Sequence, residues 1–169
     1  IRDFVPSRGP GDVYKRQMDE LLKSMASKDI LVEINLTSND VILGVKDAAH
    51  PLPTYLEYGV PVTLATDDEG VSRIDLTHEY QRAVTTYDLN YQQLLYFARN
   101  SLQYSFLPGA SLFSTTLSAT VVDACAATSV GSREIDKGCA DFLAASPKAT
   151  LQWELETRLS RFAARFFQP

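Results

Sequence analysis

The sequence has 169 residues, of which 45% are hydrophobic and 22% charged, a balance typical of a chain that can bury a core. Its formal net charge of -5 argues against a nucleic-acid backbone as partner, which would require clustered Lys and Arg. The longest apolar runs are too short to cross a bilayer, so no membrane span is expected.

Residues 1–17 differ from the rest of the chain. The segment shows no apolar period, and Pro6, Gly9, Pro10 and Gly11 punctuate it. We interpret it as a leader that is either disordered or foreign sequence, and we leave it out of the fold prediction.

Two short apolar runs predict β-strands. Helical spacing in residues 18–28 is followed by a strand over residues 30–36, and a second strand is predicted over residues 60–66. Both runs are apolar enough to be buried on both faces, as in parallel sheets. Between them we expect a polar loop at residues 37–40 and a helix over residues 51–58, which Gly59 ends. This order predicts parallel strands with helices packed outside.

Helices are predicted for most of the remainder. One begins at Asp75 or Thr77, another is capped by Asn90 and extends as far as Phe106, and two more cover residues 132–145 and 147–167. Trp153 on the last helix is expected in the core. Arg99 and Asn100 are expected to be polar groups in helix packing.

Two cysteines, Cys125 and Cys139, leave the compartment open. They match no metal-binding spacing. A disulfide between them would require an oxidising compartment, periplasmic or secreted, whereas two buried thiols would fit the cytoplasm.

The strongest sign of chemistry is the pair Asp67 and Asp68, directly after the second predicted strand. Enzymes with parallel sheets place catalytic groups at the carboxyl ends of strands. One side chain could face a metal and the other a ligand. The alternative is that both cap the next helix or lie in a solvated loop.

Several stretches, taken in order, resemble the adenosine deaminase family, in particular its growth-factor-related branch. They are VEINLTSN from Val32, AAHPLPTYLEYGVPVTLATDDEGVSR from Ala48, DLTHEY from Asp75 and FARNSLQYSFLPG from Phe97. The resemblance implies an α/β fold, namely the last two strands of a (β/α)₈ TIM-type barrel, plus a helical C-terminal extension. The corresponding domains are the leader at 1–17, the barrel part at 18–109 and the extension at 110–169.

The same resemblance implies a zinc-dependent hydrolase that converts a purine nucleoside to inosine and ammonia. Asp67 would be a zinc ligand, and Asp68 would hydrogen-bond to a ring nitrogen of the purine. The segment Thr37, Ser38 and Asn39 would form a second loop at the barrel mouth, close to the metal site, or else a plain turn. Glu69 replaces the proline that often follows the Asp pair, which favours the growth-factor-related branch.

Most of the catalytic set that the resemblance requires is absent from this sequence. The family needs an H-x-H pair, a further metal-binding His, a catalytic Glu and another His, whereas this chain has only two histidines. We expect His50 to be a loop or capping residue, His78 to be solvated or at the edge of the core, and Glu79 to have a surface or packing role. A complete barrel also needs roughly 250 residues.

The sequence therefore predicts a barrel fragment that is inactive by itself, poorly soluble or oligomeric because of open strand edges. Two other functions stay open: a non-catalytic interaction or signalling fragment, and a related amidohydrolase that acts on another aminopurine. Homo-oligomer formation also stays open.

Overall fold

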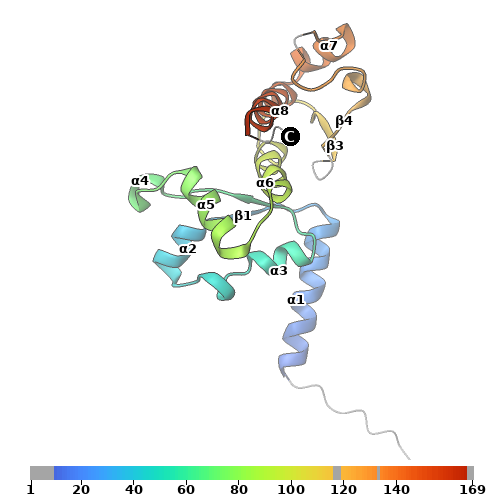
Figure 1. Cartoon of the computed structure of the whole chain (residues 1–169). Helices are drawn as coiled ribbons and strands as arrows, with labels where there is room; N and C mark the ends of the chain where they lie inside the picture. The colour runs from blue at the N-terminus through green and yellow to red at the C-terminus, as the bar shows by residue number, and fades with distance from the viewer. Residues whose placement is uncertain (1–9, 116–118, 133, 167–169) are drawn as a thin grey trace, which may run out of the picture. The chain divides into compact units, whose positions relative to one another are not determined.

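The computed structural model describes residues 10–115, 119–132 and 134–166. The chain divides into two compact units, the N-terminal unit Ile1–Asp88 and the C-terminal unit Leu89–Pro169 (Figure 1). Each unit is described by itself below.

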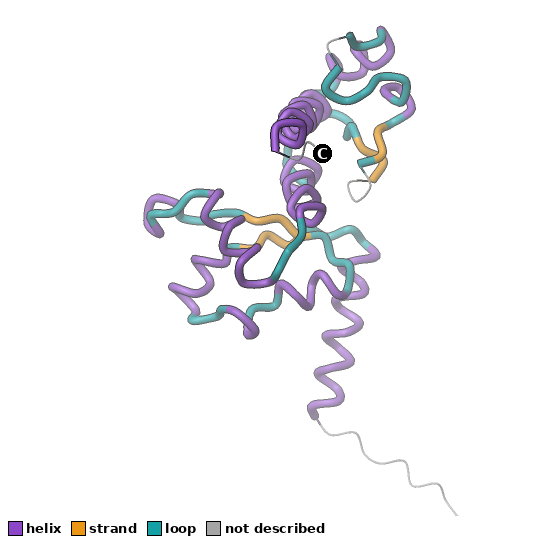
Figure 2. Tube along the Cα trace, in the orientation of Figure 1, coloured by secondary structure: helices purple, strands orange, loops and turns teal. Residues whose placement is uncertain are grey.

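A parallel pair of strands forms the centre of the N-terminal unit. In chain order its elements are α1 (Pro10–Ser27), β1 (Val32–Ile34), α2 (Leu36–Leu43), the 3₁₀ turn η1 (Asp47–Ala49), α3 (Leu52–Glu57), β2 (Val62–Leu64), α4 (Glu69–Ser72) and α5 (Leu76–Tyr87). Val32 lies opposite Val62 and Ile34 opposite Leu64, and Figure 2 shows the two strands side by side. The predicted parallel pairing is confirmed.

The two strands differ in burial. All three residues of β2 are buried, as expected for a strand covered on both faces. In β1, Ile34 is buried but Glu33 is exposed, so the prediction that both faces of β1 are buried is wrong for the described structure. Both strands are also shorter than the seven-residue apolar runs suggested. The flanking apolar residues Leu36 and Val60 are buried outside the strands.

Residues 37–40 are helical, and the loop predicted for them is wrong. They belong to α2, which ends where Gly44 adopts φ = 66°, a left-handed conformation that glycine tolerates best. The first residues of α2 are buried and its last three are exposed. Asn35 is of a type often found at N-caps, but its side chain makes no capping hydrogen bond, so the start of α2 is not stabilised locally.

The helix before β1 is longer than predicted. Residues 10–17, expected to be loop or foreign sequence, belong to α1, while residues 1–9 lie outside the described residues. In the middle of α1, Asp19 accepts a hydrogen bond from the Tyr58 hydroxyl. This bond joins α1 to the residue after α3.

The C-terminal unit is mostly helical. It contains α6 (Tyr91–Gln103), β3 (Phe113–Thr115), β4 (Thr120–Val121), the 3₁₀ turn η2 (Asp123–Cys125), α7 (Lys137–Ala145) and α8 (Pro147–Phe166). Asn90 caps α6 in a reciprocal pair of hydrogen bonds with Gln93, as predicted. α6 ends before Phe106, and α7 begins at Lys137 rather than near residue 132. The short antiparallel pair β3–β4 was not predicted.

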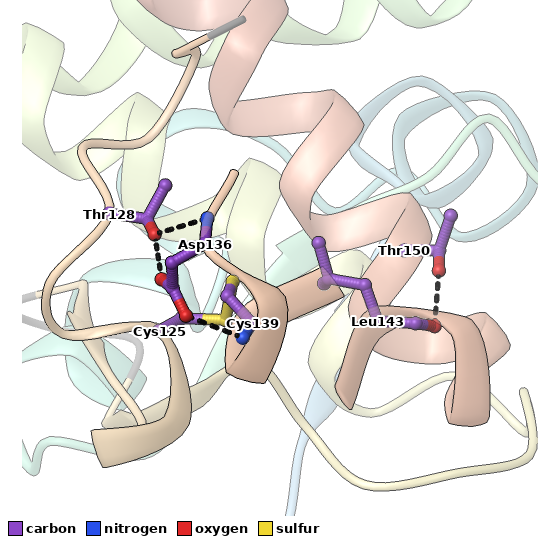
Figure 3. Close-up of a disulfide and its surroundings, with 6 residues drawn as sticks. All are labelled: Cys125, Thr128, Asp136, Cys139, Leu143 and Thr150. Atoms are coloured by element: carbon purple, nitrogen blue, oxygen red, sulfur yellow. Dashed lines mark hydrogen bonds between the residues drawn. A yellow bond between two sulfur atoms is a disulfide. The ribbon is translucent and has the colours of Figure 1, made fainter. Parts of the chain in front are cut away.

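An apolar cluster holds the C-terminal unit together, with a disulfide inside it. Its buried members are Leu112, Phe113, Cys125, Cys139, Leu143, Ala149 and Trp153. Trp153 is thus a core residue, as predicted. The bond between Cys125 and Cys139 joins η2 to the start of α7, which resolves the alternative that the sequence left open (Figure 3).

Polar contacts complete this unit. Asp136 accepts a hydrogen bond from the N–H of Cys139 at 3.1 Å and another from the Thr128 hydroxyl (Figure 3). These two bonds lower the pKa of the Asp136 carboxyl, with the Thr128 bond the larger cause. Arg99 on α6 makes a two-point ion pair with Glu156 on α8, at 2.7 and 3.0 Å. The packing role expected for Arg99 is confirmed.

Candidate functional site

The candidate site lies where the two parallel strands end. β1 and β2 run in register, and the N–H of Ala65 donates to the carbonyl of Ile34 at 3.0 Å. The segments that follow the strands therefore leave the same edge of the sheet. After β1 the chain enters α2, and after β2 it reaches Asp67. This edge is where parallel α/β enzymes carry their functional groups.

A hydrogen bond joins the two segments. Ser38, which is 7% exposed, donates from its hydroxyl to Oδ2 of Asp67 at 2.8 Å. Asp67 itself is exposed, and its backbone has φ = 54°, a conformation uncommon for a residue other than glycine. The bond restrains one carboxylate oxygen and leaves further acceptor positions on the carboxylate, which has about four in all.

The side chain of Asp68 caps no helix. Asp68 occupies the N-cap position of α4 but makes no capping hydrogen bond with its side chain. Only its backbone carbonyl is engaged there, accepting from the N–H groups of Val71 and Ser72. The capping alternative is therefore wrong for the Asp68 side chain. The exposed carboxylate can meet a molecule outside this chain.

His50 is a capping residue, as predicted, and its ring is fully engaged. It is 3% exposed, and its Nδ1 accepts from the N–H of Leu52 at 3.1 Å. Its Nε2 lies 2.9 Å from the Asn39 side-chain amide on α2. Burial lowers the pKa of His50, with a further lowering from the charge of Arg82, so the neutral ring is favoured. A ring with both nitrogens bonded is poorly placed to hold a metal.

His78 also stays away from the strand ends. Its side chain is exposed on α5, and its backbone N–H donates to the capping Asp75 at 2.8 Å. The prediction that it is solvated is confirmed. Within the described ranges, no group of three or more His, Cys, Asp or Glu side chains could hold a metal ion. The residues here fit one position of a metal's ligand set, through Asp67, and do not fit a complete site.

Glu79 has the packing role that was one of its two predicted roles, but its contact with α2 was not predicted. It is fully buried, so a surface role is wrong, and its carboxylate binds the first backbone N–H groups of α2. Its spacing contained a usable sign. Glu79 lies four residues before the buried Ala83, on the same face of α5.

One polar atom at the strand end has no partner. Oδ1 of Asn35, the residue directly after β1, is buried without a hydrogen bond in the described structure. Buried polar atoms of this kind are rare and costly. Asn35 is three residues before Ser38, in the segment that follows β1.

The pair Asp67 and Asp68 thus follows one of two parallel strands, and a hydroxyl from the segment after the other strand binds Asp67. α/β enzymes carry their functional groups at this edge of the sheet. A sequence model of the family described as adenosine deaminase matches residues 11–118, which is more than half of the chain. The chain belongs to the adenosine deaminase family.

Curated relatives agree with this assignment. The adenosine deaminases of Escherichia coli strains UTI89 and SE11 are 40% and 39% identical to it over 108 residues. The aligned part is 63% of this chain and 32% of each relative, so the chain spans about a third of the length of these proteins. The family predicted from the sequence is confirmed, whereas the growth-factor-related branch stays a prediction.

The family match stops at residue 118, so the disulfide between Cys125 and Cys139 lies beyond it. Among the helices of the described residues, none is both long and apolar enough to cross a membrane.

Proposed function

We propose that this chain supplies part of the active site of a zinc-dependent hydrolase that deaminates a purine nucleoside to inosine. The observation that carries the proposal is the 2.8 Å bond from Ser38 to Asp67, which orients a carboxylate at the carboxyl ends of two parallel strands in a member of the adenosine deaminase family. The strand pair would be the last two strands of a (β/α)₈ barrel.

Asp67 is assigned as one metal ligand. Carboxylate oxygens are ordinary zinc ligands. The Oδ2 atom of Asp67 accepts a hydrogen bond from Ser38, and we assign Oδ1 to the metal. The remaining ligands would come from sequence outside the described residues. We therefore derive no reaction step through the metal from this chain.

Asp68 is assigned as a substrate contact. It is exposed and its side chain makes no capping bond, which leaves both carboxyl oxygens for hydrogen bonding to a purine ring nitrogen. Neighbouring carboxylates with different surroundings commonly take different roles in enzyme sites.

The test uses the full-length protein that contains this chain. Asp67→Asn should lose bound zinc and more than about 100-fold in kcat/KM, because even residues that only support metal ligands contribute about 10- to 100-fold. Asp68→Asn should retain zinc and lose kcat/KM for purine nucleosides. Glu69→Gln, at the exposed neighbouring position, should resemble the unmodified protein in both.

Two results would contradict the assignment. One is full zinc content and full turnover in Asp67→Asn. The other is clear deamination of adenosine by the 169-residue chain alone with added zinc, because the described residues contain no group of three or more His, Cys, Asp or Glu side chains that could hold the metal. A panel of aminopurines tests whether a related substrate is preferred.

A non-catalytic interaction role is the second candidate. It is favoured by core residues that lie beyond the family match, among them the disulfide pair Cys125 and Cys139 together with Trp153. The sequence upstream of this chain in its gene decides between the two. If it lacks an H-x-H pair, the catalytic proposal fails.

A further inference from the structure

Helix α2 lacks a cap of its own. Asn35 at the N-cap position makes no capping hydrogen bond with its side chain, and the first turn contains no acidic residue. The first N–H groups of any helix have no partner within the helix. Here two of them belong to Leu36 and Thr37, which are both buried and therefore poorly placed to be hydrated.

Glu79 supplies the missing cap from a distant part of the sequence. Its Oε2 accepts from the N–H of Leu36 at 2.8 Å, and its Oε1 accepts from the N–H of Thr37 at 3.1 Å. Glu79 lies on α5, 43 residues after Leu36. A carboxylate at this position also interacts favourably with the positive end of the helix dipole.

Arg82, one turn after Glu79 on α5, also contacts α2. Its Nη2 lies 2.6 Å from Oδ2 of Asp40, and its Nη1 donates to Oγ1 of Thr37 at 3.3 Å. The Arg82 guanidinium is the main cause that lowers the pKa of the Asp40 carboxyl. We call Glu79 and Arg82 the α5 clamp, because together they hold both the first turn and the middle of α2.

The clamped helix carries Ser38. This residue directly follows Thr37 and donates the hydrogen bond to Asp67. A shift of the first turn of α2 would move the Ser38 hydroxyl relative to β2. Asp67 lies in an exposed turn, so no packing of its own side chain would then fix the carboxylate.

We propose that Glu79 is a positioning residue: by capping α2 from α5, it places Ser38 so that the Asp67 carboxylate is held in one orientation. The inference rests on the proposed role of Asp67. Both Glu79 oxygens are bonded to backbone N–H groups in a fully buried position, so Glu79 acts through Ser38 and does not touch substrate.

The first experiment measures structure in the 169-residue chain by NMR. Glu79→Gln keeps the size of the side chain but leaves a single acceptor oxygen, and its NH₂ group faces a backbone donor. Amide exchange at Leu36 and Thr37 should become at least about 10-fold faster, as expected when a buried bond is lost. The Asp67 carboxyl ¹³C resonance should move toward its position in Ser38→Ala.

Two further variants serve as a control and as a second test for this measurement. Glu57→Gln makes the same chemical change at an exposed site on α3 and should alter neither observation. Glu79→Asp keeps the charge but shortens the reach. It should give the same direction of change as Glu79→Gln, and it serves if the amide variant does not fold.

The second experiment measures kinetics in the full-length protein. Glu79→Gln should lower kcat about 10- to 100-fold, the range found for groups that orient metal ligands. In a Ser38→Ala background the same substitution should have little further effect, because the route through Ser38 is already cut. A merely structural role would instead give an equal loss in both backgrounds.

The outcomes separate this inference from the proposed function. If Glu79→Gln leaves the Asp67 resonance unchanged, or if its kinetic loss is undiminished in Ser38→Ala, the positioning role is overturned. If the full-length protein deaminates no purine nucleoside, the proposed function fails, and the NMR comparison still decides whether Glu79 orients Asp67.

Discussion

Both units of this chain combine buried apolar side chains with an ion pair between elements, but the disulfide belongs to the C-terminal unit. The C-terminal unit encloses an apolar cluster around a disulfide, with the apolar side of Trp153 packed into it. The N-terminal unit is joined across its elements by carboxylates: Glu79 caps α2, and Asp40 pairs with Arg82. It also exposes large apolar side chains at Val41, Ile42, Leu43 and Val71, each more than 65% exposed.

This difference follows from what each unit can cover. A two-stranded parallel sheet has two open edges, and parallel sheets are normally covered on both faces. The C-terminal unit closes its own core with helices. The chain itself spans about a third of the length of the curated relatives it matches.

The largest effect is expected from breaking the ion pair between Arg99 and Glu156. Both side chains are 11% exposed, so Arg99→Ala leaves a carboxylate buried without its partner. We expect a loss of about 3–5 kcal/mol in the unfolding free energy of the C-terminal unit. Urea unfolding followed by the fluorescence of Trp153, the chain's single tryptophan, measures it.

Two controls sharpen that result. Arg158→Ala removes the partner of Glu154 in an exposed pair and should change the midpoint little. The double variant Arg99→Met with Glu156→Leu should recover most of the lost stability. A small effect of Arg99→Ala would show that the pair is hydrated in solution.

The second effect comes from removing the disulfide. Replacing Cys125 and Cys139 by alanine opens a loop of 14 residues in the denatured chain, which corresponds to about 3 kcal/mol. The transition seen by Trp153 should move to lower urea concentration. Amide exchange in β2 should stay the same, because that strand belongs to the other unit. Parallel shifts in both units would show that they unfold as one.

The smallest effect concerns pH. Burial lowers the pKa of His50 below its ordinary value of 6.5, so the unfolded chain binds this proton more readily than the folded one. The stability of the N-terminal unit should therefore be complete above pH 6.5 and should fall as the pH decreases below it. Protonation of His50 would also place an N–H group on Nδ1, facing the backbone N–H of Leu52 that now donates to this atom.

Urea unfolding at several pH values, read from amide exchange in β2, measures this decrease. His50→Gln should remove most of the dependence between pH 5 and 7, and His78→Gln should not, because His78 is exposed. The unfolding midpoint measured by Trp153 fluorescence should change less over the same pH range, since both histidines lie in the N-terminal unit. An unchanged slope in His50→Gln would assign the dependence to other groups.

Local patterns predicted the elements whose determinants are local. α5 begins after Asp75, whose side chain accepts from the N–H of His78, and α6 begins after Asn90 in the same way. The parallel pairing also followed from the order of the elements. α2 could not be predicted, because the group that completes its first turn is Glu79.

The candidate site was predicted only in part. The position of Asp67 at a strand end followed from the pattern, and parallel strands made a neighbour from the segment after β1 plausible. That this neighbour is Ser38 depends on the exact start of α2. The disulfide could not be derived either, because a spacing of 14 residues is compatible with both thiols and a bond.

The cap on α2 has a consequence for the order in which the protein folds. During synthesis Leu36 leaves the ribosome 43 residues before Glu79, and in that interval its N–H group lacks its native partner. Contacts between residues so far apart in sequence form slowly compared with local ones. The native cap of α2 can therefore form only after α5 has been synthesised. The native position of Ser38 beside Asp67 depends on that step.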